Sequence, residues 1–148
     1  MGNRYIIARD NVTPTGGQDV LTVISATGRR VRVCEISVVG RGSSSAAQQF
    51  QVGRSTAGTT PGGAITPGKA DHTEQPAAAL TTATTWAAQP TPETNYEVVG
   101  WNALGVPNRW IPPKGSILEA RNGECISIRA PTGPTYQAVS FSAVVEED

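Results

Sequence analysis

The stretch SILEARNGECISIRA, residues 116–130, decides the fold class. Two runs in which apolar and polar side chains alternate, 116–121 and 124–130, flank the dipeptide Asn122-Gly123. Alternation with a period of two residues is typical of β-strands, because successive side chains of a strand point to opposite faces. Asparagine and glycine both tolerate the positive φ that a type I′ turn requires. We therefore predict a β-hairpin at these residues.

The C-terminal segment Ala138–Glu146 shows the same alternation. One face would carry the apolar side chains of Val139, Phe141, Ala143 and Val145. The other face would carry Ser140, Ser142 and Glu146. This pattern predicts a strand of an antiparallel sheet that has one face in a core and the other in solvent.

Further strands are predicted from runs rich in β-branched residues that lie between turn signals. These runs are Arg4–Arg9, Asp19–Ser25, Arg30–Val39, Gln48–Val52 (with Phe50 and Val52 inward) and Tyr96–Trp101. The turn signal Thr27-Gly28 separates the second run from the third, so we expect these two to form a hairpin. In the third run the apolar positions change phase at Cys34, which a β-bulge or burial on both faces would explain.

Residues 53–95 have a different composition, dominated by Thr, Ala, Gly and Pro. The large apolar anchors within them are Ile65, Leu80 and Trp86. Such a segment buries too little apolar surface to fold by itself. We expect a long arm or loop that is disordered alone or pinned against something else, with a strand at Ala77–Trp86.

The number of short strands, about eight, and the long Gly- and Pro-rich connections predict an all-β fold. We expect an antiparallel β-sandwich, with a jelly roll as the favoured version and a small closed barrel as the alternative. A length of 148 residues and a mass of 15.4 kDa fit one domain, residues 1–148, with an extended insertion at about 53–95.

The charge balance argues against some partners. Twelve basic and twelve acidic side chains give a net charge of zero, whereas proteins that bind nucleic acid usually carry a basic surplus. No run of about 18 apolar residues is present to span a bilayer, and the N-terminal residues lack the apolar stretch of a secretory signal. We expect a chain made in the cytoplasm, without nucleic-acid or membrane partners.

The sequence offers few residues for catalysis or metal binding. The one histidine, His72, lies between Asp71 and Glu74 in the low-complexity segment, and neighbouring ligands in a flexible loop lack the rigid spacing of a metal site. Cys34 and Cys125 lie in strand-like runs, where the usual role is that of a small buried hydrophobe; a disulfide between them stays open. We expect no enzyme activity, no cofactor and no metal.

Arginine and tryptophan point to protein contacts instead. Ten of the twelve basic residues are arginines, whose planar heads with several donors suit protein interfaces. The candidate contact residues are Arg4, Arg9, Arg41, Arg54, Trp86, Arg109 and Trp110. We assign Trp86 to an interface because its surroundings offer little to pack against, whereas Trp110 could lie in the core or at an interface.

Three blocks carry a resemblance to a known family. They are Arg109–Gly115 (RWIPPKG), the strand–Asn122-Gly123–strand hairpin, and the final strand Ser140–Glu147 (SFSAVVEE). Together with the Thr/Ala/Gly/Pro-rich middle, they resemble the jelly-roll head decoration proteins, or capsid cement proteins, of tailed bacteriophages. The resemblance implies a homo-oligomer, a trimer or dimer, on the outer surface of the virion, where it bridges subunits of the major capsid protein. It implies no catalytic residues.

Two other hypotheses stay open at this stage. A receptor- or glycan-binding tip of a phage tail fibre would also be a β-sandwich, and it would need an exposed aromatic or polar groove. A small hydrolase or nucleotide enzyme would need His72 or a cysteine to converge with carboxylates.

Overall fold

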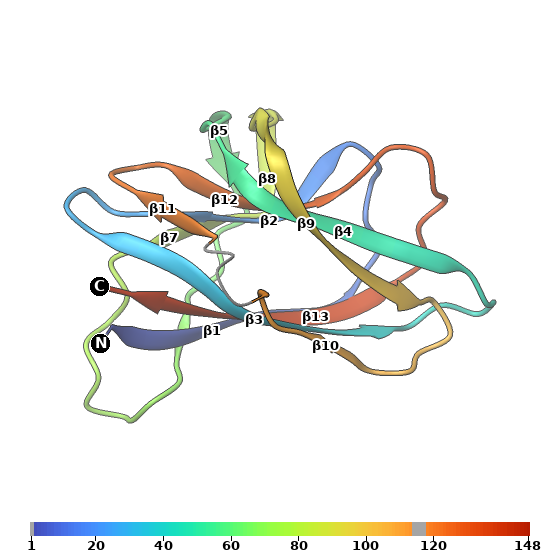
Figure 1. The fold of residues 1–148 in the computed structure, drawn as a ribbon, viewed down its shortest axis with the longest axis horizontal. Helices are drawn as coiled ribbons and strands as arrows, with labels where there is room; N and C mark the ends of the chain where they lie inside the picture. The colour runs from blue at the N-terminus through green and yellow to red at the C-terminus, as the bar shows by residue number, and fades with distance from the viewer. Residues whose placement is uncertain (1, 114–117) are drawn as a thin grey trace.

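The computed structural model describes residues 2–113 and 118–148. Within these ranges the chain forms thirteen strands and no helix, so no described helix could cross a lipid bilayer. Two sheets lie face to face (Figure 1). Sheet A contains β1 (Asn3–Val12), β3 (Arg30–Gly40), β6 (Gly68–Lys69), β10 (Asn108–Trp110), β11 (Glu119–Arg121) and β13 (Val139–Glu147). Sheet B contains β2 (Gln18–Ile24), β4 (Ala47–Ser55), β7 (Thr81–Ala83), β9 (Pro92–Asn102) and β12 (Cys125–Ala130).

The main strands pair in a nested order along the chain. β1 pairs with β13, β2 with β12, β3 with β10 and β4 with β9, all antiparallel. Successive strands of this nest lie alternately in sheet A and sheet B, so a long double-stranded ribbon is folded over into two layers. The predicted antiparallel β-sandwich is confirmed, and the nested order is consistent with a jelly roll.

Both predicted hairpins are wrong in their pairing. Asn122 and Gly123 do adopt positive φ values of 52° and 86°, and the Glu124 N–H donates to the Arg121 carbonyl at 3.0 Å, which closes the expected turn. The flanking strands, however, lie in different sheets: β11 pairs with β3, while β2 and β4 occupy both edges of β12. Residues 116 and 117 of the predicted first strand lie outside the described residues.

The same holds for the predicted hairpin between β2 and β3, which lie in sheet B and sheet A respectively. The two inter-sheet turns contact each other. The Gly28 N–H donates to Asn122 Oδ1 at 3.0 Å, and the Gly123 N–H donates to Ser25 Oγ at 3.0 Å. Both turns therefore cross from one sheet to the other at the same end of the sandwich.

A β-bulge at Cys34 explains the change of phase in β3. Val33 lies opposite Val145 and Glu35 lies opposite Val144, so Cys34 is the extra residue. The bulge transfers the buried positions from Val33 to Ile36 and keeps both side chains in the core. The first of the two explanations expected from the sequence is thus confirmed.

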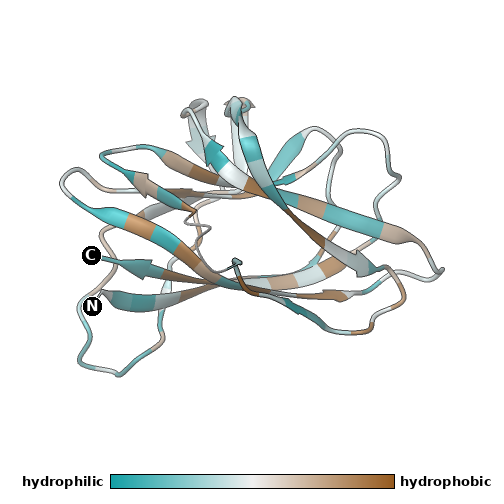
Figure 2. Cartoon of the chain, in the orientation of Figure 1, coloured by the Kyte–Doolittle hydropathy of each residue, from teal (hydrophilic) through white to brown (hydrophobic). Residues whose placement is uncertain are grey.

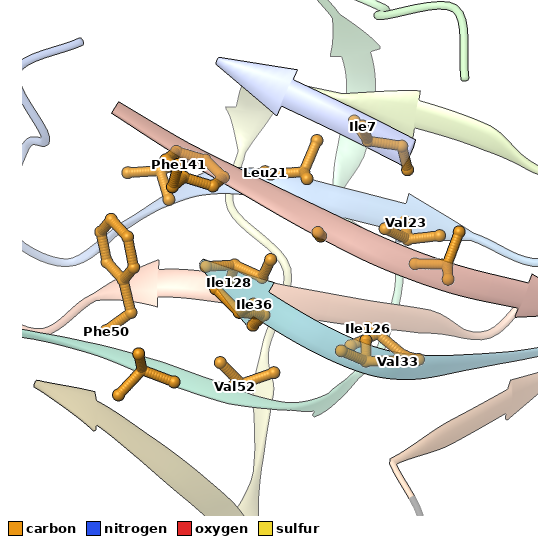
Figure 3. Packing of buried hydrophobic residues seen from close by; sticks show 14 of the residues in the cluster. Ile7, Leu21, Val23, Val33, Ile36, Phe50, Val52, Ile126, Ile128 and Phe141 are labelled. Atoms are coloured by element: carbon orange, nitrogen blue, oxygen red, sulfur yellow. The ribbon is translucent and has the colours of Figure 1, made fainter. Parts of the chain in front are cut away.

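The core lies between the sheets. Apolar side chains from both layers meet there, as Figure 3 shows for Ile7, Ile36 and Phe141 of sheet A and Leu21, Val52 and Ile128 of sheet B. Phe50 is fully buried, with its ring centroid 4.3 Å from that of Trp101 and 5.3 Å from that of Phe141. Figure 2 shows hydrophobic residues along the middle of the sheets and hydrophilic residues where β1, β3 and β13 approach the chain termini.

The segment 53–95 is pinned against its own sandwich. β6 extends sheet A beside β1, and β7 extends sheet B beside β2. β5 (Thr59–Gly62) and β8 (Thr85–Ala88) form a two-stranded sheet that stands out from sheet B in Figure 1. Of the expected anchors, Leu80 is buried and Ile65 packs against the core. The strand expected at Ala77–Trp86 is present in part, as β7 and the start of β8.

Replacement of Phe50 by alanine should lower the free energy of unfolding by about 3–5 kcal/mol, because the fully buried ring would leave a cavity between Trp101 and Phe141. Val98→Ala on the outer side of β9, where the side chain is 46% exposed, should cost less than about 1 kcal/mol. Urea denaturation measures both. Equal losses for the two variants would contradict this position of the core.

Replacement of Gly123 by alanine should lower the free energy of unfolding by about 1–2 kcal/mol, because an L-residue is strained at its φ of +86° although nothing crowds the site. Gly100→Ala is the matched control, since its backbone lies outside the left-handed region and its new Cβ would make only an ordinary 3.7 Å contact with Gln48 O. Thermal denaturation measures the stability of both variants. A Gly123→Ala variant as stable as the parent protein would contradict the left-handed turn conformation at this residue.

Candidate protein-binding surfaces

The outer face of sheet A carries small and apolar side chains where a solvent-facing sheet usually presents polar and charged ones. The strand register aligns Ile6 with Val144, and it places Ala8, Ser142 and Ser37 in one row. A shallow groove of about 440 Å³ lies over these strands. Its mostly apolar walls include Ala8, Ser37, Val39, Pro107, Ser140 and Ser142. We call this hollow the sheet A groove.

Arg41 and Asp10 form one rim of the sheet A groove. Arg41 Nη2 lies 3.7 Å from Asp10 Oδ1, and its Nε donates to Ser140 Oγ at 3.1 Å. The Ser140 hydroxyl in turn donates to Asp10 at 2.5 Å. The side chain of Asp10 is 82% exposed, so its charge remains available to a partner.

Arg109 and Glu35 form the opposite rim. Arg109 lies on β10, with Nη2 2.6 Å from Glu35 Oε2 and a side chain that is 65% exposed. The hydrogen bond from Arg109 holds the pKa of the Glu35 carboxyl below its usual range. The same contact raises the pKa of the Arg109 guanidinium. The ion pair therefore favours the charged form of both groups.

Arg9 and Arg4 occupy different positions on β1. Arg9 lines the groove but is partly buried, with Nη1 donating to the Val20 carbonyl at 2.8 Å, and burial lowers its pKa. Arg4 lies away from the groove, near the chain termini, where its Nε is 3.5 Å from Glu146. Arg32 also bonds Glu146, so this carboxylate holds two arginines together.

Trp86 covers a buried polar network on sheet B. Its indole N–H donates to Thr22 Oγ1 at 2.9 Å, and the Thr22 hydroxyl donates to Asp19 at 2.7 Å. Asp19 also accepts from Ser127 and lies 2.8 Å from Arg129 Nε. Trp86 thus has surroundings that the sequence did not reveal, and it is half-buried by them.

Arg54 and Trp110 complete the predicted set. Arg54 on β4 is about half exposed, with Nη2 3.0 Å from Glu93 on β9. Trp110 on β10 is half-buried and packs against the core cluster, opposite Ile36 in the strand register. The structure therefore places Arg41 and Arg109 at the rims of one groove, turns the Arg9 guanidinium toward sheet B, and leaves the other four residues at separate places.

Several residues of this surface were not predicted from the sequence. Asp10 and Glu35 each pair with an arginine from a distant strand, which no local pattern indicates. The exposed apolar residues Leu104, Val106 and Ile111 lie beside β10. The one available signal was the outward series Ser140 and Ser142 of the last strand, whose small side chains leave room for a hollow.

The cysteines are unpaired, and they do not gather with acidic residues into a metal site in the described part of the chain. Cys34 and Cys125 are free thiols rather than a disulfide. Burial raises the pKa of Cys125 to about 11, which keeps it a thiol at neutral pH. Among residues 2–113 and 118–148, no group of three His, Cys, Asp or Glu side chains could hold a metal ion.

Comparisons with protein-family models, curated proteins and solved structures found no match for this chain.

Replacement of Arg109 by alanine should raise the pKa of Glu35 toward its usual range, because the charged hydrogen bond would be lost. A depressed carboxyl pKa stabilises the fold above the pKa of the unfolded chain, and this contribution disappears as the pH falls through the folded pKa. The free energy of unfolding of the variant should therefore be lower than that of the parent at neutral pH, and the two free energies should converge in acid. An NMR titration of the carboxyl carbon measures the shift, with Arg54→Ala as the control that leaves Glu35 unchanged.

Proposed function

We propose that this protein is a structural virion protein that binds the outside of a phage capsid and cements neighbouring subunits of the major capsid protein. The observation that carries the proposal is the division of its candidate contact residues between two layers. Arg41 and Arg109 flank the sheet A groove, whereas Arg54 lies on β4 of sheet B and Trp86 lies on β8 with its indole against β2 of sheet B. A cementing protein must contact at least two neighbours, which can be capsid subunits or another copy of itself, and two separate surfaces meet that requirement.

The chemistry of these surfaces supports protein contacts. Arginine heads on partly buried stems make several hydrogen bonds at once, and the apolar floor of the groove gains from being removed from water. Each contact is modest because the exposed ion pairs are screened by solvent. Repetition over a symmetric lattice would multiply modest contacts through avidity.

Mass action would then stabilise the shell. A protein that binds the assembled lattice but not the free subunits lowers the free energy of the assembled state. No step of covalent chemistry is required of any residue. The arm of residues 53–95 contributes indirectly to capsid binding, because its strand β8 positions the candidate contact residue Trp86 against sheet B.

The composition of the groove favours this proposal over a glycan-binding fibre tip. A fibre tip would need an exposed aromatic or polar groove. Among the described residues that line the sheet A groove, the one aromatic ring is that of Phe141, which is 4% exposed. The sheet A groove therefore lacks the exposed ring that a glycan-binding tip would use.

Binding to capsids tests the proposal. The purified protein should sediment with expanded capsids built from the major capsid protein of the same phage, and it should raise the temperature at which these shells open. Arg54→Glu should weaken this binding at least about tenfold, because it places an acidic group beside Glu93 where the parent has a cation.

Arg29→Glu is the matched control for the charge change, since Arg29 is exposed at the closed end of the sandwich and outside the candidate set. It should leave capsid binding unchanged. If the parent protein stays in the supernatant at every protein concentration, the cement proposal is wrong; binding on a glycan array would then favour the fibre tip.

A further inference from the structure

Exposed apolar side chains gather around the sheet A groove. In the described part of the chain, the large exposed apolar residues are Ile6, Tyr96, Val98, Leu104, Val106 and Ile111. Four of the six adjoin sheet A: Ile6 lies on its outer face, Leu104 and Val106 lead into Pro107 of the groove, and Ile111 follows β10. Val106 is 74% exposed. Clustered exposure of this kind marks a surface that another molecule covers.

An exposed apolar segment thus adjoins the groove through Pro107. The loop 103–107 carries Leu104 and Val106, and it connects β9 to the β10 edge of sheet A. The groove extends from that edge across β3 and β13 to Ala8 and Asp10 on β1. A surface that carries exposed apolar residues beside an apolar hollow can pair with a copy of itself, so that the apolar residues of each copy cover the hollow of the other.

The charges on the two rims are complementary under the same pairing. Asp10 lies on β1, beyond the residues that pair with β6, and Arg109 lies at the β10 edge, with β13 and β3 between them. A two-fold axis in the contact plane and parallel to the strands exchanges these edges. Arg109 lies in the row of Ser37, Ser142 and Ala8, and Asp10 lies two residues further along β1. The long side chain of Arg109 in each copy then reaches along the strand direction to Asp10 of the other. The within-chain partners Arg41 and Glu35 would extend each contact into a chain of alternating charges.

We propose that the outer face of sheet A is the interface of a two-fold symmetric dimer of this chain. Ala8, Ser142 and Ser37 form its close-packed centre, because their small side chains allow two sheets to approach. Leu104 and Val106 cover the ends. In this dimer the two copies of sheet B face outward. Only the assignment of these outward faces to the capsid rests on the proposed function.

Charge reversal across the interface tests the dimer. Sedimentation velocity over a wide range of protein concentrations should show a dimer for the parent protein. Arg109→Asp and Asp10→Arg should each weaken dimerisation at least about tenfold, because each variant alone places like charges opposite one another at both symmetric contacts. An equimolar mixture of the two variants should form a heterodimer, since both contacts then join opposite charges.

Arg54→Asp is the matched control on sheet B and should leave the dimer intact. Circular dichroism verifies that each variant is folded, and Arg109→Gln with Asp10→Asn serves as a milder pair if one is not. A monomeric or trimeric parent, a dimer that survives Arg109→Asp unchanged, or a mixture that does not associate would each overturn the proposal. Sedimentation of the parent protein with capsids is a separate measurement. If the protein proves not to be a dimer, that measurement still tests the cement proposal.

Discussion

The burial of one face of each sheet against the other is the interaction on which the rest of the structure depends. Phe50 in sheet B and Phe141 in sheet A meet across this layer, with Trp101 beside them. Because side chains alternate along a strand, every residue fixed in the core directs its neighbours outward. Phe141 inward sets Ser140 and Ser142 outward. The floor of the sheet A groove is thus a consequence of core packing.

The local features of the fold could be predicted from the sequence, and the pairing of the strands could not. Alternation in the last strand and the phase change at Cys34 depend on neighbouring residues, and both appear in the structure. The turn at Asn122-Gly123 also forms as expected. Its strands separate into two sheets because β2 and β4 occupy both edges of β12, and this competition involves residues about 70 to 110 positions away.

In the candidate site, too, the residue types could be predicted from the sequence and their spatial neighbours could not. Arg41 and Arg109 were identified from residue type, because arginine is suited to protein contacts. Their partners Asp10 and Glu35 come from other strands, so only the strand order and register could reveal them. Trp86 gives a further example: its segment offers little to pack against, yet the fold brings Thr22 to its indole nitrogen. Residue chemistry could therefore be predicted, and residue neighbourhood required the fold.

The outer face of sheet A is set by the packing of the core, carries the groove, and is the proposed interface between two copies of this chain. The most direct test of this interface is hydroxyl-radical footprinting of the purified protein at low and high concentration. If this face joins two copies of the chain, labelling of Ile6, Val106 and Ile111 falls as concentration rises, while labelling of Tyr96 on sheet B stays constant. Constant labelling of all four residues, or protection of Tyr96 alone, would contradict this interface.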